Sequence, residues 1–474
     1  MAIKTQNGLT ERQVLREIVL QGDTWGSLLA SVQVDNIGKD CVEAGLGYMY
    51  KNILPIGFLG LVDDVICVTE AGYKAQEMNS FMNVKTAEKN LQFGISKCKS
   101  MLIGKNTENV INNQLMVDGW NANYEDDGDE VNLIETFSGL VNIEKTNEQK
   151  YLGYVISSKG DNMANIIQVR NKSIGIIRKI LNRLNGSNLG KYYFESSLIL
   201  MDSMLRGSIL YASEVYYGLK ESEIRQLERM EESYMRQVLK TSRGCPITQI
   251  YLELGQIPAR FQIKKMRLLF LKDILHQNIE SMISKVFQLQ LEKPSKGDWP
   301  SSCIKDLEEL QIAMSFEEIK LISKNRFNKI LNERIKEASL SYLTGKQNTK
   351  GGDIIYTKIE MSEYLSPLSN LSIDDKRRLF AVRNMMVDIP ANFSNSNENI
   401  KCIHGEQKHI AHIYQCELLS SDKSNIEYEK FIMEAYTNKS ETNEETLCHG
   451  IHCTLLRIVL DKYILLTYPF ASQD

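Results

Sequence analysis

The alternation of apolar and polar residues along the chain predicts a mixed α+β fold. Two apolar runs flank a turn, and they predict a β-hairpin with strands over residues 58–62 and 65–69. Residues 74–91 carry apolar side chains at helical spacing, and this helix should end at Gly94. The residues expected to face inward from it are Met78, Phe81, Met82, Val84, Ala87 and Leu91.

From Asp161 onward the pattern becomes helical. Apolar residues recur every three or four positions up to Gly186, while Lys172, Lys179 and Arg183 fall outside the apolar stripe. The stripe that we expect to face the core consists of Met163, Ile167, Arg170, Ile174, Ile177, Leu181 and Leu184.

Two more amphipathic helices are expected after this one. The first covers residues 221–240, and the second begins at Pro258, because proline suits the first helical turn. Clusters of Pro, Gly, Ser and Asn predict linkers at residues 292–303, 347–353 and 393–402. The residues expected to face inward from the first helix are Ile224, Leu227, Met230, Tyr234 and Val238.

The composition is that of an ordinary globular protein. The chain has 474 residues, of which 43% are hydrophobic and 24% charged, so two or three domains are expected. The most apolar stretch, residues 453–470, is interrupted by Arg457, Asp461 and Lys462 and is not expected to span a bilayer. The first 23 residues do not have the pattern of a signal peptide. We therefore expect an intracellular protein of the cytoplasm or nucleus, without a membrane partner.

Charge is distributed unevenly along the chain. Residues 101–150 contain 10 acidic and 3 basic side chains, including an acidic segment that predicts an exposed turn around Asp127 and Gly128. Residues 161–290 contain 19 basic and 12 acidic side chains. A basic excess on helices suits contact with the phosphate backbone of nucleic acid. The alternative is that these charges simply cover solvent-exposed helix faces.

The turn of the predicted hairpin carries two adjacent carboxylates, Asp63 and Asp64. Rigidly held carboxylate oxygens are the ligands that Mg²⁺ prefers, and two such ions stabilise the attacking and leaving oxygens of a nucleotidyl transfer. Aspartate is also a common turn residue, so the pair alone is equally compatible with a structural turn.

Several segments occur in an order that resembles the reverse transcriptase of non-LTR (LINE-like) retrotransposons. Residues 21–27 resemble its Gln-Gly motif, residues 61–64 its Asp-Asp box, and residues 91–104 the Gly and Lys motif that follows. Residues 151–161 resemble the turn that leads from the palm into the thumb-like helices. Residues 172–184, 208–218 and 249–258 resemble the connected helices, so the similarity covers most of residues 11–280.

The resemblance implies an RNA-directed DNA polymerase whose partners are an RNA template and a DNA primer. Asp63 and Asp64 would then be catalytic Mg²⁺ ligands, and Lys97 or Lys99 would assist proton transfer to the leaving pyrophosphate. Gln21 and Gly22 would lie beside the template and the incoming nucleotide.

Two departures from the family pattern bear on activity. Leu61 and Val62 replace the aromatic residue and alanine that usually open the Asp-Asp box. The family's first catalytic aspartate should lie upstream of Gln21, but this segment contains only Glu11 and Glu17 as acidic residues. The fingers subdomain has no counterpart either. We therefore expect a truncated reverse transcriptase that does not polymerise DNA by itself, because one carboxylate motif cannot clamp both ions. The alternative is a non-catalytic nucleic-acid-binding protein.

Cysteine and histidine gather near the C-terminal end. Cys402, His404, His412 and Cys416 offer two thiolates and two imidazoles, with the last two residues at helical i, i+4 spacing, and this set predicts a Zn²⁺ knuckle. His409 is an alternate ligand, and unrelated surface histidines are the competing interpretation. A second cluster, whose role stays open, consists of Cys448, His449, His452 and Cys453. The other five cysteines are expected to be buried singly: Cys41, Cys67, Cys98, Cys245 and Cys303.

The sequence thus predicts an α+β chain with a partial polymerase palm, made of a short antiparallel sheet with helices. A mainly α-helical thumb and connector and a small Cys/His zinc knuckle follow it. The oligomeric state is not predicted. The expected divisions are a partial palm at 1–105, an acidic β connection at 106–155, a helical thumb-like domain at 156–290, a helical linker region at 291–395, the zinc knuckle at 396–420 and a C-terminal tail at 421–474.

Overall fold

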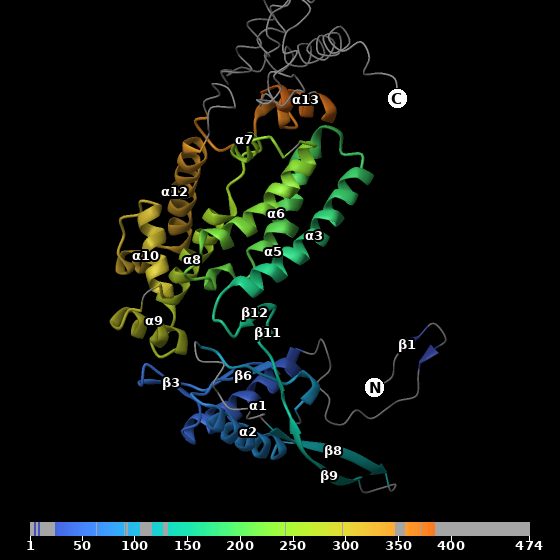
Figure 1. The fold of residues 1–474 in the computed structure, drawn as a ribbon, viewed down its shortest axis with the longest axis vertical. Coiled ribbons are helices and arrows are strands. Elements are labelled where there is room, and N and C mark those ends of the chain that lie inside the picture. Colours follow the sequence, from blue (N-terminus) through green and yellow to red (C-terminus); the bar gives the residue numbers. More distant parts are fainter. Residues whose placement is uncertain are drawn as a thin grey trace, which may run out of the picture. The chain divides into compact units, whose positions relative to one another are not determined.

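The computed structural model describes residues 4–5, 8–9, 24–62, 64–89, 91, 93–104, 116–126, 131–241, 243–295, 297–346, 356–369 and 371–383. It divides into an N-terminal unit, Met1–Asn165, and a helical unit, Ile166–Asp474. Figure 1 shows the elements of both units. Helices dominate and the described strands form two-stranded sheets, so the predicted α+β class is confirmed in general form. None of the described helices is long and apolar enough to cross a membrane.

The N-terminal unit combines short strands with two long helices. Every strand pair in it is antiparallel except that of β7 with β10, which is parallel. Its elements are β1 (Lys4–Thr5), β2 (Gly8–Leu9), α1 (Thr24–Glu43), β3 (Tyr48–Tyr50), β4 (Leu54–Ile56), β5 (Phe58–Leu61), β6 (Asp64–Cys67), α2 (Gly72–Ala87), the 3₁₀ turn η1 (Ile95–Lys97), β7 (Lys99–Ser100), β8 (Met116–Asp126), β9 (Val131–Asn142), β10 (Glu144–Lys145), β11 (Glu148–Tyr151) and β12 (Tyr154–Ser157).

The core of the N-terminal unit forms between α1, α2 and the hairpin of β5 and β6. Ile37 and Cys41 of α1 and Met78 and Met82 of α2 are buried, and apolar side chains of the hairpin pack against them. Gly38 lets α1 approach the hairpin, because a Cβ at this position would lie 2.5 Å from the Phe58 ring. The two helices therefore form the base that supports the hairpin.

The helix α2 differs from its prediction at the C-terminal end. It ends at Ala87 instead of reaching Leu91, and Val84 is exposed. The buried residues in the last part of the helix are instead Asn83 and Thr86. The Thr86 hydroxyl donates to the Met82 carbonyl at 2.8 Å. A threonine can occupy a buried helix position when its hydroxyl bonds to the preceding turn in this way.

The other described helices belong to the helical unit, apart from the first residues of α3 (Figure 1). Their bounds are α3 (Met163–Gly186), η2 (Gly190–Tyr192), α4 (Tyr193–Leu200), the π-helical segment η3 (Met201–Arg206), α5 (Gly207–Ile209), η4 (Ser213–Val215), α6 (Glu221–Leu239), α7 (Ile247–Glu253), α8 (Ala259–His276), α9 (Met282–Glu292), α10 (Trp299–Glu309), α11 (Phe316–Leu321), α12 (Lys324–Gly345), η5 (Glu363–Leu365) and α13 (Ile373–Arg383).

The helices α8 to α12 enclose one apolar core. Leu268 and Leu271 of α8 are fully buried there, together with Cys303 of α10 and Phe327 and Leu331 of α12. The carbonyl groups at the C-terminal end of α11 receive hydrogen bonds from a buried lysine. Lys272 donates to the carbonyls of Ile319, Lys320 and Ile322. These five helices therefore pack around a common centre.

The buried face of α3 was predicted only in part: Ile177 and Leu184 are buried as expected, but other members of the predicted stripe are not. Ile167 and Ile174 are 40% and 44% exposed, and Arg170 is exposed as well. The sequence places isoleucine at both 166 and 167 and at both 176 and 177, so it offers two registers of apolar residues. Packing selects the register whose buried members are Ile166, Val169, Ser173, Ile177, Ile180 and Leu184.

The linker predicted at residues 292–303 is only partly correct, because α10 begins at Trp299. Asp298 caps this helix by accepting from the Ser301 amide at 3.0 Å, and Pro300 lies in its first turn. Aspartate and proline also occur in loops, but both are favoured where a helix begins.

Candidate functional site

The Asp-Asp box lies at the tip of a tight β-hairpin. The strands β5 and β6 pair with Leu61 opposite Asp64, so the connection consists of residues 62 and 63 alone. Val62 has a φ of 57°, which is the left-handed backbone that two-residue hairpin turns require and that a β-branched residue rarely adopts. The side chain of Asp64 is exposed, whereas Asp63 lies outside the described residues.

A second tight hairpin brings Tyr151 close to Asp64. The strands β11 and β12 pair Tyr151 with Tyr154 across a turn in which Leu152 and Gly153 have φ values of 47° and 86°. Burial raises the pKa of the Tyr151 phenol, and the negative charge of Asp64 raises this pKa further. The phenol of Tyr151 therefore lies within the electrostatic reach of the Asp64 carboxylate.

The structure distinguishes the two candidate lysines. The Lys99 ammonium forms an ion pair with Glu144, and the same two residues are opposite each other in the parallel pair of β7 and β10. Lys97 is exposed in η1 and has no ion pair within the described residues. Of the two, Lys97 therefore has the ammonium that is available to a ligand.

The remaining predicted site residues lie outside the described residues. This applies to Gln21 and Gly22 and to the four zinc ligands Cys402, His404, His412 and Cys416. Among the scattered cysteines Cys41, Cys245 and Cys303 are buried as expected, whereas Cys67 is exposed and Cys98 is intermediate.

The described residues around the hairpin do not form a complete Mg²⁺ site. Nowhere in the described part of the chain do three or more His, Cys, Asp or Glu side chains come together as metal ligands. A two-ion centre needs several carboxylate oxygens held in place. Asp64 alone does not meet this requirement, so no catalytic step through a metal follows from the described residues.

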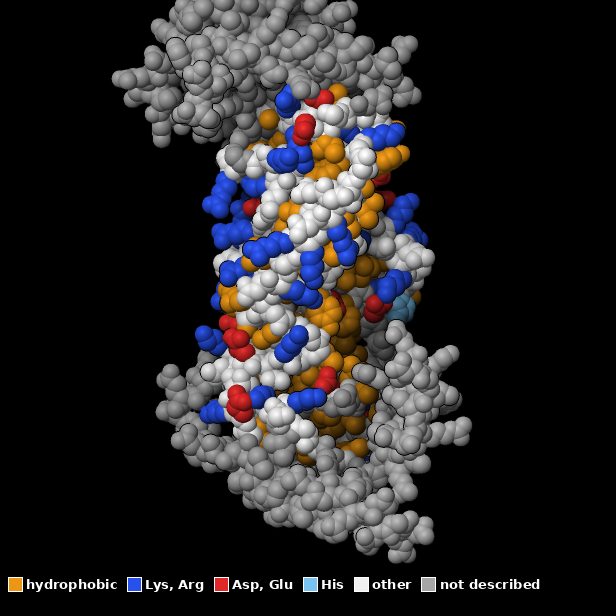
Figure 2. Space-filling view, turned by 90° about the vertical axis from the view of Figure 1, so that its right-hand side faces the viewer, with side chains coloured by type: hydrophobic (Ala, Val, Ile, Leu, Met, Phe, Trp, Pro, Cys, Tyr) orange, Lys and Arg blue, Asp and Glu red, His pale blue; other side chains and the backbone are white. Residues whose placement is uncertain are grey.

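The helix α3 carries an exposed set of basic residues, which we call the α3 cationic face. It consists of the exposed residues Arg170, Lys172, Arg178, Lys179 and Arg183. Residues 162–194 contain no acidic side chain, and these five cations have no ion pair within the described ranges. Figure 2 shows Lys and Arg side chains gathered on the side of the molecule that α3 lines in Figure 1.

Helical geometry arranges these cations on two flanks. Lys172, Lys179 and Arg183 are spaced i, i+7 and i+11 and lie in one line, about 10 Å and about 6 Å apart along the axis. Arg170 and Arg178 lie on the other flank, beside the exposed Ile167 and Ile174. Exposed cations without counter-charges are what an anionic backbone requires of a protein surface.

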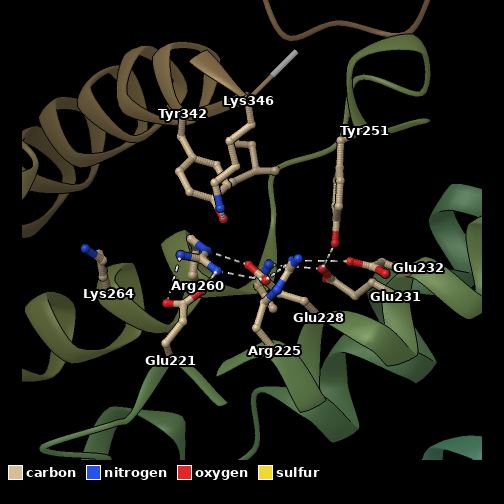
Figure 3. Close-up of polar contacts among 12 residues, drawn as sticks. Glu221, Arg225, Glu228, Glu231, Glu232, Tyr251, Arg260, Lys264, Tyr342 and Lys346 are labelled. Atoms are coloured by element: carbon tan, nitrogen blue, oxygen red, sulfur yellow. Dashed lines mark hydrogen bonds and ion pairs between the residues drawn. The ribbon is translucent and has the colours of Figure 1, made fainter. Parts of the chain in front are cut away.

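A separate polar cluster joins α6 to α8 and α12 (Figure 3). Arg260 donates to Glu228 at 2.6 Å and to Glu221 at 2.8 Å, and its guanidinium lies 4.5 Å from the centre of the Tyr342 ring. The buried Glu231 accepts from the Tyr251 hydroxyl at 2.9 Å and from the Ala259 amide at 3.0 Å. Its carboxylates accept from protein donors, so the cluster fastens these helices to one another.

Sequence reasoning missed two features of these sites. Tyr151 was grouped only with a turn, and no local pattern relates it to Asp64, which lies far upstream. Glu223, Glu228 and Glu231 were not singled out from the sequence, but all three are buried. The only signal for them was their position on the apolar side of α6, next to Leu227 and Tyr234.

Comparison with known proteins gives no relative for this chain: no protein-family model, no curated protein and no solved structure matches it.

Proposed function

We propose that this chain is a reverse-transcriptase-like module that binds an RNA template and a DNA primer but does not extend the primer by itself. The N-terminal unit would present Asp63 and Asp64 as a palm does, and the helical unit would contact the nucleic-acid backbone through the α3 cationic face.

The observation that supports this proposal is the exposed Asp64 at the tip of the β5–β6 hairpin. A structural aspartate in a turn normally bonds to nearby backbone groups. Asp64 instead projects from a turn with a strained Val62, and strained backbone persists where the surroundings demand it, often at functional sites. Tyr151 and Lys97 belong to the same unit, so a phenol and a free ammonium accompany this carboxylate.

The lack of primer extension is proposed because one carboxylate motif would hold Mg²⁺ incompletely. Loss of metal ligands removes most of the rate that a two-ion centre provides. A second carboxylate contributed by another polypeptide would restore this chemistry.

Primer extension and binding, measured together, test the proposal. The purified chain should bind an RNA template annealed to a DNA primer and leave the primer unextended with Mg²⁺ and nucleoside triphosphates. Asp63→Asn with Asp64→Asn is the matched inactive variant, and Glu43→Gln, on the exposed end of α1, is the control. Extension lost only in the aspartate variant would show an active enzyme, and absence of binding would refute the module.

The second candidate is a nucleic-acid-binding protein that catalyses no reaction. The α3 cationic face alone supports it. Such a protein would grip phosphates and shape in a salt-dependent way and would need no Mg²⁺ at the hairpin. The two candidates differ in one result. Binding that is unaffected both by Mg²⁺ and by the two aspartate substitutions favours this second function.

We also propose a structural Zn²⁺ held by Cys402, His404, His412 and Cys416, with His409 as the alternate ligand. The spacing of two thiolates and two imidazoles supports it. Elemental analysis of the purified chain should find one zinc, and Cys402→Ser with Cys416→Ser should remove it. The matched control is Cys448→Ser with Cys453→Ser, which should retain the metal.

A further inference from the structure

The side chain of Lys376 on α13 is completely buried, although it carries an amino group. Its Nζ donates to the carbonyls of Ser366 at 2.7 Å, Leu365 at 3.3 Å and Lys191 at 3.5 Å. It has no ion pair with a carboxylate among the described residues. This one amino group therefore joins α13 to η5 and to η2, two segments that are distant from it in sequence.

The next residue, Arg377, fastens α13 to a third element. Its Nε and Nη2 donate to the Val238 carbonyl at 3.1 and 3.0 Å, near the end of α6, and its guanidinium lies 5.0 Å from the centre of the Tyr193 ring. Leu379 and Phe380 are buried on the same helix. The docking of α13 thus combines apolar contact with two adjacent cations that bind carbonyl oxygens.

We propose that α13 is a proton-controlled latch on the helical unit, which closes more tightly when Lys376 loses its proton. The inference does not depend on nucleic-acid binding, because every group in it belongs to the helical unit itself.

The physical basis is the cost of burying an unpaired charge. An ammonium removed from water without a carboxylate partner is strongly disfavoured, whereas a neutral amine costs less and keeps two N–H donors for the nearest carbonyls. Burial, together with the positive charge of Lys191, lowers the pKa of Lys376 to about 8. When α13 detaches, the amine returns to water and its pKa returns to the ordinary value of about 10.4.

The sign of the pH effect follows from these two states. Between pH 8 and pH 10 the detached helix binds a proton that the docked helix has released, so raising the pH favours docking. Below pH 8 Lys376 is protonated in both the docked and the detached helix. Docking then bears the full free-energy cost of burying the ammonium.

The kinds of titratable group near Lys376 bear on any pH effect between pH 7 and pH 9. Carboxyl, tyrosyl and guanidinium groups, and lysines in water, have ordinary pKa values outside this window. Neither histidine nor cysteine occurs among the titratable or charged residues of η2, of η5 and of positions 374–378, which are Lys191, Tyr192, Glu363, Tyr364, Asp374, Asp375, Lys376, Arg377 and Arg378.

Amide hydrogen exchange of the full chain at pH 7 and pH 9 tests the latch. After correction for the intrinsic exchange rate, the protection of residues 363–369 and 373–383 should be roughly tenfold higher at pH 9, relative to α6. Lys376→Gln removes the charge and should abolish this dependence. Arg378→Gln, an equal change of charge on the exposed side of α13, should retain it.

Two results would overturn the latch: equal protection at both pH values in the unaltered chain, or a tenfold response that persists in Lys376→Gln. Circular dichroism identifies a variant that does not fold, and Lys376→Met is then the second neutral substitution. The measurement on the unaltered chain decides the matter without any variant, and no nucleic acid is present in it.

Discussion

Arg206, at the end of the π-helical segment η3, donates its Nε–H to the buried carboxylate of Glu231 on α6 at 2.7 Å. Its other nitrogens donate to Asp202 at 2.7 Å, to Gln256 at 2.9 Å and to the Ile257 carbonyl at 2.8 Å. The guanidinium therefore connects η3, α6 and the segment before α8 within the interior of the helical unit.

Glu231→Gln should destabilise the protein by about 3–5 kcal/mol, because it removes the buried counter-charge of Arg206 and leaves only the largely exposed Asp202. The amide would also present donors to the Ala259 N–H and the Tyr251 hydroxyl, which both donate. Urea denaturation followed by circular dichroism measures the loss. Glu232→Gln on the same helix is the control and should cost less than about 1 kcal/mol, since burial raises the pKa of Glu232 and disfavours its charge. Equal losses in both variants would contradict this account.

Val62→Gly should stabilise the β5–β6 hairpin by about 1 kcal/mol, because glycine adopts a φ of 57° without the strain that valine suffers there. Hydrogen exchange of residues 58–67 measures this local gain. Leu59→Gly, in the middle of β5, should have the opposite sign, because a strand interior is weakened by glycine. A loss of protection in Val62→Gly would show that the turn is not strained.

Gly255→Ala should detach the segment 356–369 from α7. Gly255 has a φ of 63°, and a Cβ here would overlap the backbone of Glu360 and Met361. The segment is otherwise held by the Ser362 amide, which donates to the Glu253 carbonyl at 2.8 Å, and by the Tyr356 hydroxyl. We expect a loss of at least about 2 kcal/mol from the strain and the broken contacts. Limited proteolysis should then cut this segment faster.

The control for this variant is Gly175→Ala in α3, where a Cβ would enter open space. Alanine should stabilise α3 by about 0.5–1 kcal/mol, as it does in exposed helix interiors. Both variants add one methyl group, so opposite signs would separate the effect of position from that of size.

Lys172→Gln, Lys179→Gln and Arg183→Gln combined should weaken nucleic-acid binding most strongly at low salt. If each cation neutralises one phosphate, the slope of log affinity against log salt should become shallower by about 3. Fluorescence anisotropy over a salt series measures it. The control triple is Lys324→Gln, Lys329→Gln and Lys336→Gln on α12, which is also exposed and should leave the slope unchanged. Identical slopes for both triples would remove the α3 cationic face from the interface.

The β5–β6 hairpin and the helices α3 and α6 could be predicted from the sequence because their signals are local. Apolar runs on both sides of a turn predict the hairpin, and helical spacing predicts α6 to within one residue of its observed end. The predicted turn, at Asp63 and Asp64, was one residue too late, because the observed turn is residues 62 and 63 and Asp64 pairs with Leu61 as the first residue of β6. The face that a helix buries is a different question. Adjacent isoleucines made two faces of α3 almost equally apolar, so only packing with distant segments decides between them.

The ionic interior of the helical unit could not be predicted, because its partners are far apart in sequence. Arg206 meets Glu231 across 25 residues, and Arg267 meets Asp306 across 39. Charged side chains are normally exposed unless a specific partner compensates them. Tyr151 escaped prediction for the same reason, since its relation to Asp64 arises from two separate hairpins.

The π-helical segment Met201–Arg206 makes the chain intolerant of a change in length at this point. Such a segment holds one residue more than an α-helix would, and each residue turns the chain by about 100° around the axis. Deleting a single amino acid here would restore α-helical geometry. It would also rotate the segment after the deletion by about 100° relative to the segment before it. The guanidinium of Arg206 and the apolar face of α4 could then no longer point inward together.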